Sequence, residues 1–140
     1  MNLGFHLSLF HSLNQLFDLL NLEYRRQELL DQIVSFPAGW KLLVVFSAVV
    51  MAPLAEEIFF RGLCQSMLRK YLRSPWAAVL ITSAFFALFH APYWQIMPTL
   101  FFLSIALGYT YERSGRLFSP ILVHAIFNAV NIGIVLTSGE

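Results

Sequence analysis

The sequence predicts an all-α membrane protein, a polytopic helix bundle of about four core transmembrane helices preceded by an N-terminal amphipathic helix. Two observations carry this prediction. Of the 140 residues, 58% are hydrophobic and only 12% are charged, whereas a soluble domain typically carries about 25% charged residues. In addition, long apolar segments alternate with short stretches rich in Pro, Gly and charged residues, which end helices. Lipid is therefore the expected solvent for most of the chain.

The charge and cysteine content excludes several classes of protein. The formal net charge is +1, and no basic run is long enough to follow a phosphate backbone, so we expect no nucleic-acid partner. The only cysteine is Cys64, which rules out an internal disulfide and a cysteine-based metal site. The N-terminus lacks the basic region of a signal peptide. The length fits one domain, which we divide into an N-terminal segment at 1–36 and a core at 37–140.

The N-terminal segment is predicted to lie on the bilayer surface. Residues 3–22 place apolar side chains at helical spacing on one face and polar side chains on the other. Such a helix is interfacial rather than membrane-spanning. The apolar positions are Phe5, Leu9, Leu13, Leu16, Phe17 and Leu20.

The first core helix is predicted over about residues 40–71, after the breaker at 36–40. It is longer than the roughly 20 residues that cross a bilayer, so its basic C-terminal end should emerge into water. Pro53 removes one backbone donor, and we expect a kink there.

Three further core helices follow. The pair Ser74-Pro75 reads as a helix cap followed by proline and predicts a helix over 76–89 that ends at His90. A second runs from 95 or 98 to 111, and Ser119-Pro120 starts the last, over 120–137. The loops after the first and third core helices carry five basic residues. The segments on the opposite side of the membrane carry only Lys41, so the two basic loops are predicted to lie in the cytoplasm. The five are Arg69, Lys70, Arg73, Arg113 and Arg116.

The first core helix carries charges where it should be buried in lipid. Ionisable groups inside a membrane are costly and usually mark function. Glu57 and Arg61 are four residues apart, hence neighbours on one helix face that should pair. Glu56 is displaced by about 100° around the helix. It has no local counter-charge, which suits a general base.

Two later helices carry polar groups that are able to meet these charges. His90 ends one helix, and His124 with Asn128 forms a polar stripe at four-residue spacing on another. We expect all of them to face one polar cavity, which forms an active site within the membrane.

Two chemistries fit this set of residues. In the first, Glu56 and His90 activate a water molecule, while His124 and Asn128 donate hydrogen bonds to the oxyanion of an amide under attack. In the second, Glu56, His90 and His124 bind zinc, which activates the water. The helical His-Glu-x-x-His signature is absent, and Asn128 is a poor zinc ligand but a good oxyanion donor. The expected cofactor is therefore none, with zinc as the alternative.

A reading without catalysis also accounts for the polar residues. Polar stripes in membrane helices often serve as interhelical hydrogen-bond partners. The same cluster would then belong to an immunity or transport scaffold that binds an ion or a peptide.

Three motifs in this order resemble those of the CAAX prenyl endopeptidase and bacteriocin-processing family of intramembrane proteases, also called the CPBP or Abi family. Glu-Glu-x-x-x-Arg is present at 56–61, Phe-x-x-x-His at 86–90 and His-x-x-x-Asn at 124–128. The resemblance covers about residues 40–135. Members of the family commonly have several more spans, where this chain has the amphipathic segment.

The resemblance implies a function for each motif. Glu56 and His90 would activate the water, Glu57 and Arg61 would orient the site, and His124 with Asn128 would stabilise the oxyanion. Family members have been described both as metalloproteases and as glutamate-dependent enzymes. The implied substrate is a peptide or a lipidated protein, met in contact with membrane lipid, and the implied location is a bacterial inner membrane. The implied activities are cleavage of a CAAX-type tail and bacteriocin self-immunity or processing.

Overall fold

The computed structural model describes residues 36–91 and 96–138, and every regular element within them is helical. The prediction of an all-α fold is confirmed. The interfacial helix predicted at 3–22 and its continuation to 35 lie outside the described residues, and the domain boundary at 36 stays a prediction.

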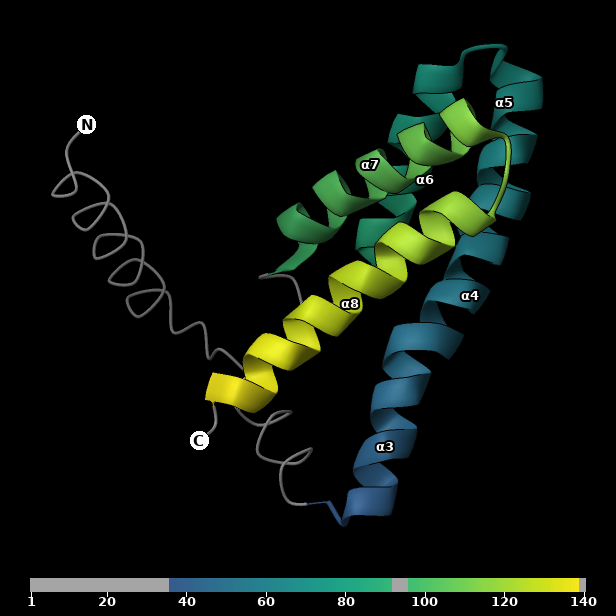
Figure 1. The fold of residues 1–140 in the computed structure, drawn as a ribbon. Helices are drawn as coiled ribbons and strands as arrows, with labels where there is room; N and C mark the ends of the chain where they lie inside the picture. The colour runs from purple at the N-terminus through teal and green to yellow at the C-terminus, as the bar shows by residue number, and fades with distance from the viewer. Residues whose placement is uncertain (1–35, 92–95, 139–140) are drawn as a thin grey trace, which may run out of the picture.

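A single rod of five helical segments forms one side of the molecule (Figure 1). It consists of α3 (Ala38–Phe46), the π-helix η1 (Ser47–Met51), α4 (Ala52–Glu57), the π-helix η2 (Ile58–Gln65) and α5 (Ser66–Leu72). Together they give an uninterrupted helix over Ala38–Leu72, close to the predicted 40–71. Among the described residues, this is the one helix both long and apolar enough to cross a membrane. The predicted number of four spans therefore stays a prediction.

Three more helices follow within the described residues: α6 (Pro75–Phe89), α7 (Met97–Ser114) and α8 (Phe118–Ser138). Ser74 caps α6 as predicted, because its hydroxyl accepts a hydrogen bond from the Ala77 N–H at 3.3 Å. In contrast, α8 begins at Phe118, so Ser119 lies inside the helix and is not its cap. Figure 1 shows α8 crossing the bundle beside the rod, and α6 and α7 form the most extensive helix pair.

The end of α7 differs from its prediction. The sequence predicts that the helix stops at residue 111, but it continues to Ser114 and ends where Gly115 adopts a left-handed conformation with φ 63°. Glu112 is thereby a helical residue. Its carboxylate accepts from Gln65 Nε2 at 3.0 Å and pairs with Arg69, and these interactions across the helix interface stabilise the extra turn.

The distribution of polarity is inverted relative to a soluble protein. Large apolar side chains are exposed around the bundle, such as Leu42 (71%) and Phe102 (69%). Charged and polar side chains lie inside instead, and Glu57, Arg61 and Gln65 are completely buried. Exposed apolar surface of this extent is what lipid covers. The bundle therefore has the surface of a membrane protein with a polar interior.

Candidate active site

The centre of the polar interior is the carboxylate of Glu57, at the junction of α4 and η2. Its Oε1 accepts a hydrogen bond from Arg61 Nη1 at 3.0 Å and lies 2.9 Å from His124 Nδ1. Arg61 lies on the same rod as Glu57, and His124 lies on α8. All three side chains are buried, so this contact fixes α8 against the rod.

The contact with Glu57 also determines the protonation of the His124 ring. A carboxylate oxygen only accepts hydrogen bonds, so Nδ1 of His124 carries the proton. The other ring nitrogen, Nε2, lies 3.8 Å from Oε2 of Glu56. That distance is too long for a hydrogen bond. Glu56 and His124 thus lie close together without a direct hydrogen bond, and the Glu56 side chain is 28% exposed.

A third helix, α6, brings His90 near the carboxylate of Glu56. His90 caps the C-terminus of α6, where its Nδ1 lies 2.9 Å from the carbonyl oxygen of Phe86. Since a carbonyl only accepts, Nδ1 is the donor, and within the described residues Nε2 makes no hydrogen bond. His90 lies within electrostatic range of Glu56.

Phe86 packs among the charged groups of the site. Its ring centroid is 5.0 Å from that of His90 and 5.8 Å from that of His124, and the Arg61 guanidinium lies 5.2 Å from the same centroid. The ring is fully buried. It therefore contacts both imidazoles and gives the cation an aromatic face.

The guanidinium of Arg61 has a further partner that the sequence did not indicate. Its Nη2 donates to the carbonyl oxygen of Ser104 at 2.8 Å and to the Ser104 hydroxyl at 2.6 Å. Ser104 lies on α7 and is fully buried. A single serine in an apolar helix is too common to predict such a contact, so only the packing of α7 against η2 reveals it.

Ser104→Ala is expected to lower the free energy of unfolding by about 1.5–3 kcal/mol, the usual contribution of a hydrogen bond to a charged group. The loss should appear in denaturant titration of the purified protein in detergent. Ser104→Thr keeps the hydroxyl and serves as the matched control. Equal stability of the wild type and the alanine variant would show that the 2.6 Å contact is not stabilising.

Asn128 lies on α8, one turn beyond His124, and its amide contacts the rod. Its Nδ2 donates to the carbonyl oxygen of Ala48, in η1, at 2.8 Å. The amide carries two N–H bonds, so one remains for another acceptor. The described structure therefore gathers three predicted site residues, Arg61, His90 and His124, around the carboxylates of Glu56 and Glu57. Asn128 lies one helical turn from His124, and one of its two N–H bonds is already donated to Ala48 O.

Zinc requires several ligands at short distances from one point. Within residues 36–91 and 96–138, no group of three or more His, Cys, Asp or Glu side chains is arranged to hold a metal ion. The alternative zinc set of Glu56, His90 and His124 is therefore not preformed as a ligand cluster there.

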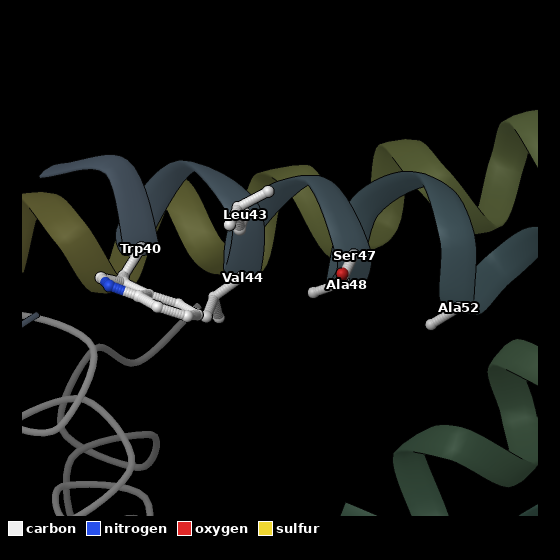
Figure 2. A pocket seen from close by; sticks show the side chains of 6 residues that line it. All are labelled: Trp40, Leu43, Val44, Ser47, Ala48 and Ala52. Atoms are coloured by element: carbon white, nitrogen blue, oxygen red, sulfur yellow. The ribbon is translucent and has the colours of Figure 1, made fainter.

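An apolar groove runs along α3 and η1, next to the Asn128 contact. Figure 2 shows its lining side chains, which come from one face of the rod. It holds about 490 Å³. Ala48, whose carbonyl meets Asn128, is one of the lining residues. The others are Trp40, Leu43, Val44, Ser47 and Ala52.

Comparison with known proteins identifies relatives for the described core. The family model for type II CAAX prenyl endopeptidase Rce1-like proteins matches residues 38–130. An uncharacterized 24.3 kDa protein of Escherichia coli is 31% identical over 97 residues, which cover 67% of this chain and 44% of that protein. The uncharacterized protein YpbD of Bacillus subtilis is 34% identical over 90 residues, 62% of this chain and 42% of YpbD. The matches thus cover less than half of either relative, and no solved structure matches.

Proposed function

Because this chain belongs to the type II CAAX prenyl endopeptidase Rce1-like family, we propose that it hydrolyses a peptide bond within the membrane, using a water molecule activated by Glu56 and His90. The family is one of membrane-embedded proteases. The observation that supports this proposal most is the position of Glu56 Oε2, 3.8 Å from His124 Nε2 and beside the buried ion pair of Glu57 and Arg61.

The reaction begins with the water molecule. Glu56 accepts a proton from the water while His90 Nε2 accepts its second hydrogen bond, and the water oxygen forms a bond to the carbonyl carbon of the substrate. Glu56 then returns the proton to the leaving amine, and the carbon–nitrogen bond breaks. The side chain serves as base first and as acid second, so it ends in its starting form.

The negative charge that develops on the carbonyl oxygen needs donors. The second N–H of Asn128 is one, and the His124 ring, held by Glu57 at Nδ1, presents Nε2 as the other contact to that oxygen. Arg61 pairs with Glu57 inside the bundle, so the charge of each is compensated by the other. Glu57 and Arg61 therefore orient the histidine without contacting the substrate.

The groove along α3 supports a lipidated substrate. Among the described residues, its lining is apolar apart from Ser47, which suits an isoprenoid or acyl chain that arrives from the bilayer. A peptide attached to that chain would meet Glu56, one to two helical turns further along the rod. The proposed substrate class is therefore a lipid-modified protein tail, and a role in bacteriocin self-immunity is a further proposal drawn from the resemblance.

The wild-type protein in proteoliposomes is expected to cleave a fluorogenic peptide that carries a farnesylated cysteine followed by three residues. Cleavage should persist after dialysis against a chelator, since the proposed chemistry requires no metal. An unprenylated peptide of the same sequence should be cleaved at least tenfold more slowly. Loss of cleavage in chelator, restored by zinc, would instead favour the zinc mechanism through Glu56, His90 and His124.

A non-catalytic scaffold is the competing proposal, and the same experiment separates the two. A scaffold would bind the farnesylated peptide without releasing its tripeptide. Mass spectrometry of the reaction mixture detects the released fragment directly.

A further inference from the structure

The hydrogen bond between Asn128 and Ala48 joins residues 80 positions apart in the sequence. It connects α8 to η1, and both η1 and α4 pack against α8. A main-chain carbonyl inside a helix normally accepts from the N–H of its own helix four residues later. The availability of Ala48 O to a side chain therefore needs an explanation.

The explanation lies in the π-helical register of η1 and in the residue that follows it. The Ala52 N–H, which would serve Ala48 O in an α-helix, donates instead to Ser47 O, five residues back. In the same register the donor for Ala48 O would be the N–H of residue 53. That residue is proline, which has no N–H. The helix therefore leaves Ala48 O without a main-chain donor, and Asn128 Nδ2 takes the position at 2.8 Å.

We propose that Pro53 is a positioning residue for Asn128: its missing N–H leaves the Ala48 carbonyl free, and the bond to that carbonyl aims the second N–H of the Asn128 amide at the reacting oxygen. The amide group is planar, so an acceptor for one N–H fixes the direction of the other. This inference rests on the proposed function, since it assigns Pro53 to the oxyanion donor of that reaction. Pro53 does not contact the substrate and acts through Ala48 and Asn128.

Pro53 is fully buried and lies three residues before Glu56. A proline in a helix interior lowers stability, because the helix loses a hydrogen bond. If Pro53 had no role in catalysis, replacing it by a residue that has an N–H should raise the stability of the protein or leave it unchanged, without an effect on turnover. If Pro53 positions Asn128, the same replacement should lower kcat while stability stays the same or rises.

The test compares Pro53→Ala and Pro53→Val in proteoliposomes with the farnesylated fluorogenic peptide. Either variant restores the N–H of residue 53, which is then able to donate to Ala48 O within the helix and to compete with Asn128 for this carbonyl. We expect kcat to fall about tenfold, because misplacement of a reacting group by about 1 Å costs up to 10²-fold, while KM and the farnesylated-peptide affinity stay within twofold. The melting temperature should be unchanged or higher. Valine resembles proline in volume, so equal losses in both variants assign the effect to the N–H and not to a cavity.

Two controls make the result specific. Pro98→Ala changes an exposed proline in the first turn of α7 and should leave kcat unchanged. Adding Pro53→Ala to Asn128→Ala should have no further effect, because the group that Pro53 positions is already absent. Wild-type kcat in both Pro53 variants, or a further tenfold loss in the double variant, overturns the inference.

Glu56→Gln, measured in parallel, separates this inference from the proposed function. If Glu56→Gln abolishes cleavage and both Pro53 variants retain the wild-type kcat, the role of Pro53 is wrong and the proposed function stands. If Glu56→Gln cleaves as fast as the wild type, the proposed function fails, and the role of Pro53 fails with it.

Discussion

Glu56→Gln is expected to lower kcat by about 10²–10⁴-fold, the range usually lost when a general acid–base group is removed. The amide has the shape of the carboxylate but does not accept a proton from water at neutral pH. The Glu56 side chain is partly exposed and makes no hydrogen bond within the described residues, and its Oε2 lies 3.8 Å from His124 Nε2. The substitution should therefore leave folding intact. Cleavage of the farnesylated peptide by purified protein in proteoliposomes measures the effect.

Glu112→Gln is the matched control for this loss. Glu112 is also a membrane-bundle glutamate with a charged neighbour, Arg69, but it lies on α7 at the far end of η2, beside Gln65. Its replacement should leave kcat unchanged. Turnover by Glu56→Gln within threefold of the wild type, with an unchanged melting temperature, would contradict the assignment of Glu56 as the base.

Arg61→Met should produce the largest loss of stability, about 3–5 kcal/mol in the free energy of unfolding, which is typical when one partner of a buried ion pair is removed. Methionine is similar in length and fills much of the space but has no charge. Glu57 would then remain as a buried carboxylate without its cation, and the two contacts to Ser104 would be lost as well. Unfolding in detergent, followed by circular dichroism, measures the change.

Two further variants test the cause of that loss. Arg113→Met removes an exposed arginine near the end of α7 and should change stability by less than about 0.5 kcal/mol, as most surface substitutions do. Combining Glu57→Gln with Arg61→Met should recover part of the stability, because the uncompensated charge is removed. Stability of Arg61→Met within about 1 kcal/mol of the wild type would show that the pair is not maintained by mutual charge compensation.

The helices themselves could be predicted from local sequence. The apolar run before Glu56 and the cap at Ser74 specify helix position through contacts within a few residues, and the rod begins and ends within two residues of its prediction. The C-terminus of α7 was predicted too early because Glu112 and Arg113 resemble a polar loop. The helical state of Glu112 depends on Gln65 and Arg69, which are more than 40 positions away in the sequence.

The composition of the candidate site was likewise available from spacing. Glu57 and Arg61 are four residues apart on one helix, so their contact at 3.0 Å follows from helix geometry alone. The sequence also identified His90 and His124 as the polar groups of their helices. It did not identify which carboxylate would hold which histidine, and His124 binds Glu57 directly while facing Glu56 at a distance.

The sequence alone determined that this is a helical protein for a lipid environment and which few polar residues its interior must accommodate, because helix period, helix ends and the cost of charge in lipid are local or compositional properties. Only the tertiary structure decided the partners of those residues: Ser104 for Arg61, Phe86 for both imidazoles, and Ala48 O for Asn128. These contacts depend on how α6, α7 and α8 pack against the rod. Packing angle and register arise from many weak interactions between distant segments, which leave no periodic signal in the chain.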